Sequence, residues 1–143
     1  MTVLNKEQIK EIIPHRDPFL LIDEVTALVP GISCTALKTL KQDEFWFKGH
    51  FPDHPVQPGV LTVEMLAQAG AVCVLAMPEN KGKLAFFAKI DKAKFRRPVV
   101  PGDTVRLEVE MIKLRSSFGV GRARATVEGE LAAEGEITFA LGK

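Results

Sequence analysis

The chain has 143 residues, 46% of them hydrophobic and 26% charged, a balance that fits one compact domain over residues 1–143 with enough apolar material for a core. Its two cysteines, Cys34 and Cys73, stand outside any CxxC or Cys/His array, which excludes a zinc finger and a disulfide framework and predicts two buried thiols. No secretory signal pattern is present, so the cytoplasm is the expected location.

Charge is distributed unevenly along the chain. The net charge is +1, yet residues 81–124 hold twelve Lys/Arg against four Asp/Glu, a net of +8, while the remainder holds seven against fourteen, a net of −7. This pattern predicts a cationic surface suited to an acidic or phosphorylated partner, although a solvated sheet face would give the same pattern. Nucleic acid is not favoured, because no nucleic-acid-binding motif accompanies the bases.

The first predicted elements are a short helix and a hairpin. The helix covers residues 6–13, with Asn5 as its cap and Pro14 at its end, and it is expected to pack over the core as a lid. Residues 19–29 and 33–40 are rich in β-branched and aliphatic side chains, and a Pro-Gly pair joins them. This arrangement predicts two paired strands.

The longest predicted element is a helix over residues 60–77, which is apolar on nearly every face. Such a helix is usually buried. Its length also fits a membrane span, but Glu64 and Gln68 near one end, and the lack of a second such segment, favour a core helix. Beyond it, strands are predicted over residues 84–90, 92–99, 105–114, 118–127 and 131–141.

These elements predict an α+β fold in which an antiparallel sheet curls around the long helix. One sheet of this size covers only part of a helix that is apolar all round. Self-association is therefore expected, with a dimer as the smallest assembly.

The loop before the long helix and the start of that helix carry groups suited to acid–base chemistry. Glu64 has mostly apolar neighbours at helical spacing, so its carboxyl is expected to favour the neutral form that a general acid needs, unless an unseen base pairs with it. His50 is expected to be a neutral imidazole that can act as a base. The helix begins at Pro58-Gly59, where free N–H groups can hold negative charge on a carbonyl oxygen. Together these groups predict β-elimination of water.

Two other kinds of site fit the sequence less well. His50 and His54, with His15, are candidate metal ligands, but prolines in that loop prevent the helix on which a four-residue spacing brings two imidazoles to one ion. Ser116 and Ser117 are candidate nucleophiles, but neither lies in a nucleophile-elbow pattern. Acid–base chemistry is favoured over both.

Four motifs, in this order along the chain, resemble one enzyme family. They are Pro14-His15-Arg16, the stretch from Pro18 to Asp23, the stretch from Gly49 to Glu64, and the stretch from Ile90 to Asp103. Together they resemble the FabZ-type (3R)-hydroxyacyl-[acyl-carrier-protein] dehydratases, over about residues 9–139. The resemblance implies a hotdog fold that pairs into dimers and assembles as a trimer of dimers. It also implies dehydration of (3R)-hydroxyacyl chains on acyl carrier protein to trans-2-enoyl chains, in type II fatty acid synthesis, with no cofactor and no metal.

The resemblance assigns roles to individual residues. His50 is implied as the catalytic base, and Glu64, from the other subunit of the dimer, as the acid. The Gly59 N–H would hold the thioester carbonyl, the Val56 carbonyl would orient His50, and Gln68 would steady Glu64.

Further expectations concern the acyl chain and the partner protein. Phe86 stands where some relatives place a tyrosine that gates the acyl tunnel. The partner implied is acyl carrier protein, which is acidic and carries a phosphopantetheine arm. Its expected contacts are Lys92, Lys94, Arg96 and Arg97, although these bases would also serve simply to keep the strands soluble.

Three other functions stay open beside plain dehydration. A carboxylate one methylene shorter at Glu64 would resemble the FabA-type enzymes, which also isomerise the double bond, and the glutamate favours dehydration alone. A hydrolase of acyl thioesters, with Glu64 activating water, is a second possibility. The third is an acyl-binding module that is indifferent to a change at His50.

Overall fold

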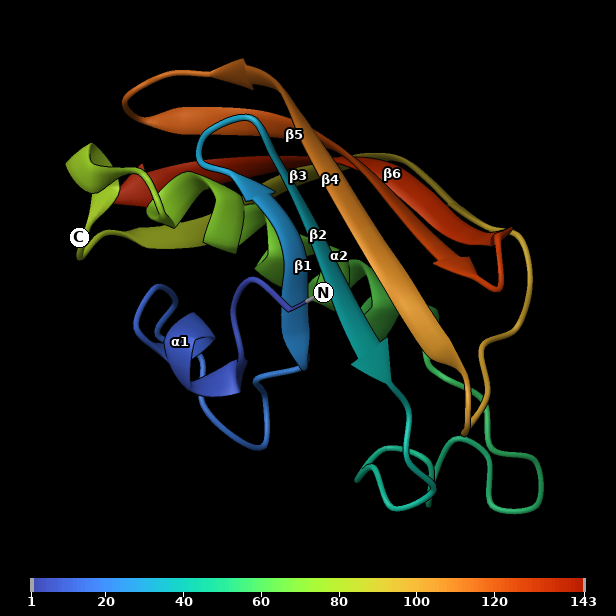
Figure 1. The fold of residues 1–143 in the computed structure, drawn as a ribbon. Coiled ribbons are helices and arrows are strands. Elements are labelled where there is room, and N and C mark those ends of the chain that lie inside the picture. The colour runs from blue at the N-terminus through green and yellow to red at the C-terminus, as the bar shows by residue number, and fades with distance from the viewer. Residues whose placement is uncertain (1, 143) are drawn as a thin grey trace.

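Six strands form one antiparallel sheet, and a long helix lies against its inner face (Figure 1) in the computed structural model, which describes residues 2–142. The order of the strands across the sheet is β1-β2-β4-β5-β6-β3. The predicted α+β architecture is confirmed. The strands are β1 (Glu24–Val29), β2 (Ser33–Thr39), β3 (Leu84–Phe95), β4 (Thr104–Leu114), β5 (Phe118–Val127) and β6 (Glu130–Gly142).

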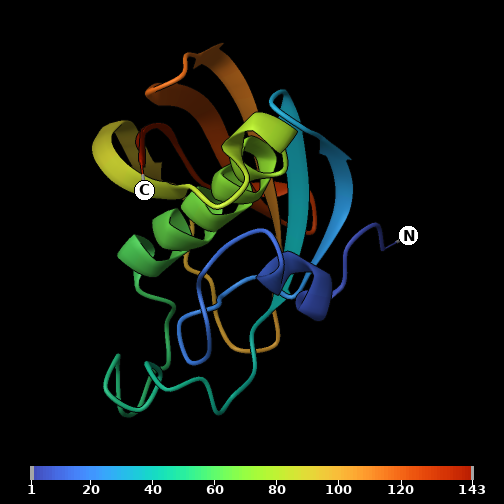
Figure 2. The same ribbon diagram turned by 90° about the vertical axis from the view of Figure 1, so that its left-hand side faces the viewer.

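Helix α2 (Gly59–Leu75) is buried within one chain over most of its length, as its sequence predicts, whereas Val60 in its first turn is 74% exposed. It contacts all six strands, and thirteen of its 17 residues are buried. The N-terminal segment covers the side that faces away from the sheet (Figure 2), where Ile9 and Ile13 belong to the same hydrophobic core. The helix ends two residues before the predicted boundary, and a short 3-10 turn, η1 (Pro78–Asn80), follows. No helix within residues 2–142 is long and apolar enough to cross a membrane.

Helix α1 (Lys6–Lys10) is shorter than predicted. Its cap is the predicted one, because the Asn5 side chain accepts a hydrogen bond from the Gln8 N–H and the Gln8 side chain accepts one from the Asn5 N–H. Past Lys10 the backbone tightens into turns, in which the Glu11 N–H bonds to the Gln8 carbonyl and the Ile12 N–H to the Ile9 carbonyl, three residues back. Ile9 and Ile13 are buried, so the segment packs on the core as expected.

Strand β1 begins at Glu24, not at residue 19. Leu20, Leu21 and Ile22 are buried in succession, which no half-exposed strand allows, since alternate side chains of a strand point to opposite faces. The backbone of this segment bonds instead to a side chain of α2, described below. The predicted strands over residues 84–90 and 92–99 are in fact one strand, β3, which keeps its pairing with β6 through two bulges, and Lys92 adopts a φ of 54° at the second.

Strand β3 lies at the edge of the sheet and pairs only with β6 within the described residues. Several of its large hydrophobic side chains are exposed. An exposed hydrophobic edge strand marks a surface for association with another chain. The exposed side chains are Phe86, Phe87, Ile90 and Phe95.

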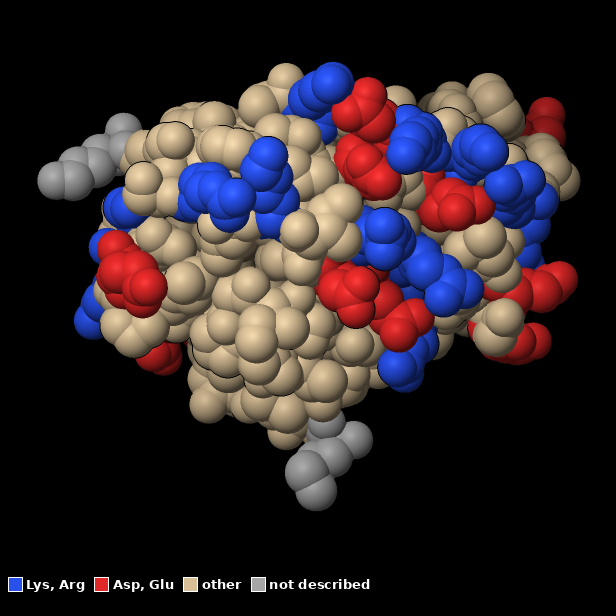
Figure 3. All heavy atoms as spheres, turned by 90° about the horizontal axis from the view of Figure 1, so that it is seen from above, with Lys and Arg blue, Asp and Glu red and all other residues tan. Residues whose placement is uncertain are grey.

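The uneven charge of the sequence does not give a uniformly cationic surface. Because β3 and β6 are antiparallel neighbours, the bases of β3 and of the residues after it meet the acids of β6. Basic and acidic side chains are interspersed on the face seen in Figure 3. The pairs are Lys92–Glu136, Arg96–Glu134 and Arg97–Glu130, with N–O distances of 3.5, 3.0 and 2.8 Å.

Candidate active site

His50 lies in the loop between β2 and α2, with one ring nitrogen already engaged. Its Nδ1 is 2.8 Å from the carbonyl oxygen of Val56, and the Val56 N–H donates in return to the His50 carbonyl. A carbonyl oxygen accepts only, so this contact assigns the ring proton to Nδ1. The Nε2 lone pair is then free to accept a proton, and the expected contact between Val56 and His50 is present.

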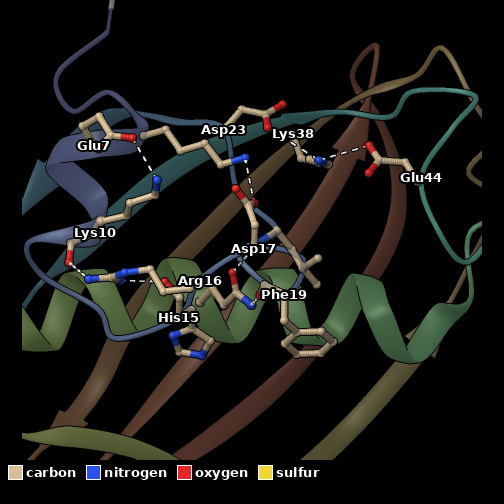
Figure 4. Close-up of polar contacts among 12 residues, drawn as sticks. Glu7, Lys10, His15, Arg16, Asp17, Phe19, Asp23, Lys38 and Glu44 are labelled. Atoms are coloured by element: carbon tan, nitrogen blue, oxygen red, sulfur yellow. Dashed lines mark hydrogen bonds and ion pairs between the residues drawn. The ribbon is translucent and has the colours of Figure 1, made fainter.

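A buried ion cluster ties this loop to the sheet (Figure 4). Lys38 of β2, whose side chain is only 7% exposed, lies 3.5 Å from Asp23 and 3.1 Å from Glu44. The Glu44 carboxylate also accepts the Lys41 N–H, at 3.1 Å, and Phe47 is buried in the core. These contacts fix the start of the segment that carries His50.

His50 lines a cavity of about 590 Å³, a volume typical of small-molecule sites. Its wall includes Gly59 at the start of α2 and the ring of Phe95, together with Arg96 and Arg97. Two arginines therefore line the same cavity as His50, and their guanidinium groups are held in ion pairs with Glu134 and Glu130. Such groups suit a phosphate or carboxylate.

Gly59 is the first residue of α2, where a helix leaves its N–H groups without internal partners. Within residues 2–142 the structure gives no hydrogen bond from the Gly59 N–H. A Cβ at this position would lie 2.7 Å from a ring carbon of Phe95, so only glycine fits without displacing the ring. The free N–H and the helix dipole suit a ligand oxygen that gains negative charge.

Glu64 lies further along α2 and is held by Gln68. The Gln68 Nε2 donates to Glu64 Oε2 at 3.0 Å and to the Phe19 carbonyl at 2.9 Å, while its Oε1 accepts the Leu21 N–H at 2.8 Å. Gln68 is 1% exposed, and both the oxygen and the nitrogen of its side-chain amide have hydrogen-bond partners. The expected contact between Gln68 and Glu64 is present, and it extends to the N-terminal segment.

Within one chain, His50 and Glu64 line different cavities. The Glu64 side chain, 18% exposed, lines a cavity of about 60 Å³ together with His15, Ala67, Ala71, Ala85, Phe87 and Phe139. A single chain therefore separates the candidate base from the candidate acid.

Sequence reasoning missed the partner of Glu64 in its own chain. His15 Nε2 lies 3.7 Å from Glu64 Oε2, and both residues line the smaller cavity. Burial lowers the pKa of His15 below 6.5, an effect opposed by the Glu64 charge and reinforced by Arg16. A shared metal would require His15 to lie beside His50. His15 lies beside Glu64 instead. Within residues 2–142 no cluster of three or more His, Cys, Asp or Glu side chains could hold a metal ion.

The remaining predicted residues lie on or just after β3. Phe86 is exposed near the start of the strand and lines neither cavity described above. Lys92 and Lys94 are exposed near its end, and Arg96 and Arg97 follow it at the larger cavity.

Comparison with known proteins places this chain beside one group of enzymes. A family model described as "FabA-like domain" matches residues 13–136. The 3-hydroxyacyl-[acyl-carrier-protein] dehydratase FabZ of Clostridium novyi (strain NT) is 54% identical over 140 residues, which are 98% of this chain and 99% of that protein. The proteins of the same name from Staphylococcus saprophyticus and Bacillus cereus (strain AH820) are 56% and 57% identical, over 98% of this chain and 97% of each relative.

The fold also matches a solved structure, "The Dehydratase Heterocomplex ApeI:P from Xenorhabdus doucetiae". The TM-score is 0.79 at 15% sequence identity, over 94% of this chain and 91% of that chain. At this identity the likeness concerns the fold alone. The hotdog fold predicted from the sequence is confirmed.

Proposed function

Because the chain belongs to the FabA-like family, and within it to the FabZ-type 3-hydroxyacyl-[acyl-carrier-protein] dehydratases, we propose that His50 and Glu64 remove water from (3R)-hydroxyacyl chains carried on acyl carrier protein. The product is the trans-2-enoyl chain of type II fatty acid synthesis. The observation that carries the proposal is the His50 imidazole, held at Nδ1 and open at Nε2, on the wall of a cavity that also contains the start of α2.

His50 acts as the base. Its Nε2 takes a proton from the carbon next to the thioester carbonyl, and the Val56 carbonyl stabilises the imidazolium that forms through the Nδ1–H. As that C–H bond breaks, negative charge develops on the carbonyl oxygen. The Gly59 N–H and the positive end of the α2 dipole stabilise this charge.

Glu64 acts as the acid. It donates a proton to the hydroxyl group on the next carbon, the C–O bond breaks, and the pair of electrons left by the first proton forms the double bond. The products are the enoyl thioester and one water molecule, with the proton now on His50. Gln68 keeps the Glu64 carboxyl oriented during this transfer.

We assign the base and the acid of each site to two subunits. In one chain His50 and Glu64 line different cavities, and the exposed hydrophobic edge of β3 is left uncovered. Pairing of β3 with its counterpart in a second chain would bury this edge and complete both sites. A trimer of such dimers is the expected larger assembly.

Subunit complementation tests this assignment. His50→Ala and Glu64→Gln should each abolish turnover while circular dichroism and gel filtration stay unchanged. When the two variants are dissociated, mixed and reassociated, half of the dimers are mixed, and each has one site with both groups intact. Activity should then recover to about a quarter of the wild-type value. Absence of recovery, with mixed dimers demonstrated by mass spectrometry, contradicts the shared site.

Acyl carrier protein is the proposed partner, and Lys92, Lys94, Arg96 and Arg97 are its proposed contacts. Three of these bases are engaged in ion pairs on the surface, which contribute little stability. Acidic side chains or the phosphate of the phosphopantetheine arm can therefore replace the intramolecular partners at low cost. Arg96 and Arg97 are the bases nearest to the reaction, because they line the cavity of His50.

The reaction itself is tested with hydroxyacyl-acyl carrier protein as substrate. Enoyl product without free thiol is the expected result, and Phe86→Tyr reports whether that position controls entry of the acyl chain. Free thiol without enoyl product would mean an acyl-thioester hydrolase, and cis-3-enoyl product would add isomerase activity. The cytoplasmic location remains a prediction, which cell fractionation tests.

A further inference from the structure

The two oxygens of the Glu64 carboxyl have different surroundings. Oε2 accepts the Gln68 amide N–H at 3.0 Å and also faces His15 Nε2 at 3.7 Å. Within residues 2–142 no hydrogen bond to Oε1 is present. The two oxygens are therefore unequal before any substrate arrives.

His15 is held firmly in its place beside α2. The guanidinium of the next residue, Arg16, donates to the backbone carbonyls of Ile13 at 3.0 Å, His15 at 2.7 Å and Lys10 at 3.1 Å. Figure 4 shows Arg16 reaching back toward Lys10 while the His15 ring lies over α2. The backbone of His15 is thus tied to α1, and its ring is directed at the carboxyl.

The surroundings of His15 also decide which nitrogen carries its proton. Nδ1 is buried and has no hydrogen-bond partner, whereas Nε2 faces a carboxyl oxygen. A proton on Nδ1 would be buried without an acceptor and would aim the Nε2 lone pair at another lone pair. A proton on Nε2 avoids both costs. At 3.7 Å the interaction is electrostatic, and a movement of about 0.7 Å makes it a hydrogen bond.

We propose that His15 is a positioning residue of the dehydration site, which acts with Gln68 to occupy Oε2 of Glu64 so that Oε1 carries the transferable proton. This inference rests on the proposed role of Glu64 as the acid. With two donors directed at Oε2, a proton on the carboxyl is favoured on the other oxygen, and the carboxyl is prevented from rotating. The charged groups that face His15 are Glu64 and Arg16.

Two variants of similar size separate this role from packing. His15→Gln places an amide nitrogen near the position of Nε2, whereas His15→Phe keeps a ring and removes the donor. For His15→Phe, kcat should fall roughly tenfold, the loss expected for one hydrogen bond to a charged group, with KM unchanged within about twofold. The alkaline limb of its kcat profile should move to higher pH, because the ionised carboxyl loses a donor. His15→Gln should stay within about threefold of wild type and keep the wild-type profile.

Wild-type kcat and pH profile in His15→Phe, whatever its melting temperature, would mean that His15 only fills space. Equal losses in His15→Gln and His15→Phe would also overturn the proposal. Should His15→Phe fail to fold, His15→Asn replaces it, since its amide is too short to reach Oε2 and it should behave as described for His15→Phe. Glu64→Gln is measured in parallel: full turnover there would overturn the acid assignment itself, whereas an inactive Glu64→Gln beside a normal His15→Phe overturns only this inference.

Discussion

Gly59→Ala tests how closely the reaction depends on the start of α2. The added Cβ would lie 2.7, 2.9 and 3.2 Å from three ring carbons of Phe95. Ordinary carbon–carbon contacts begin near 3.5 Å, so the ring must move by about 0.8 Å. In a single chain Phe95 is 54% exposed and its ring has room to swing outward, so the change in the free energy of unfolding per chain should be below about 1 kcal/mol. The melting temperature should shift by less than about 4 °C.

The effect on catalysis should be much larger than the effect on stability. The ring and the Gly59 N–H both belong to the wall of the His50 cavity, and a displacement of about 1 Å can cost about a hundredfold in rate. We expect kcat/KM for hydroxyacyl-acyl carrier protein to fall between about 10-fold and 100-fold. The matched control is Gly49→Ala, whose Cβ meets nothing within 4 Å and which should behave as wild type.

The Gly59→Ala substitution made in a Phe95→Ala variant shows whether displacement of the ring causes the loss of activity. In Phe95→Ala the obstacle to the new Cβ is gone, so Gly59→Ala should cost little further activity when both rates are compared with Phe95→Ala alone. If Gly59→Ala costs the same in both backgrounds, displacement of the ring is not the reason for the loss.

Three further predictions concern stability and reactivity. Burial raises the pKa of Cys34 to about 12 and that of Cys73 to about 11, so neither thiol should react with a disulfide reagent at pH 8 until the protein is denatured. Burial lowers the pKa of His15 below 6.5 in the folded protein, so on acidification the His15 imidazole is protonated in the unfolded chain before it is protonated in the folded one. The free energy of unfolding should therefore fall as the pH drops below about 6.5, and urea titrations should give a shallower fall for His15→Phe. Lys38→Met leaves the carboxylates of Asp23 and Glu44 without their buried partner and should lower the free energy of unfolding, measured in urea, by about 2 kcal/mol. This loss is smaller than for a fully buried ion pair because the Asp23 side chain is about a third exposed. An unchanged urea midpoint would mean that these ion pairs contribute nothing to stability.

Local patterns in the sequence predicted the elements that the site depends on. The all-round apolar character of residues 60–77 predicted a buried helix, and Glu64 was proposed as a site residue because it is the one carboxyl group on that helix. His50 could be proposed as its counterpart because the chemistry of the two groups is complementary. Each of these predictions depends on residues close together in the chain.

Contacts between distant segments could not be predicted in this way. His15 and Glu64 are brought together because the N-terminal segment folds over α2, and their spacing in the sequence carries no period that indicates this. The register of β3 against β6 decides that Arg96 meets Glu134, so the charge of residues 81–124 could not be assigned to a surface. The bulges that keep β3 continuous likewise depend on its partner strand.

The hydrogen bonds of Gln68 limit which changes of sequence the segment before β1 can accept. It reaches that segment only through backbone groups, the carbonyl of Phe19 and the N–H of Leu21. Side chains at these two positions can change without loosening the amide, provided that the core remains filled. Insertion or deletion of a single residue there would instead move both backbone partners, so this stretch should tolerate exchange of amino acids while its length stays constant.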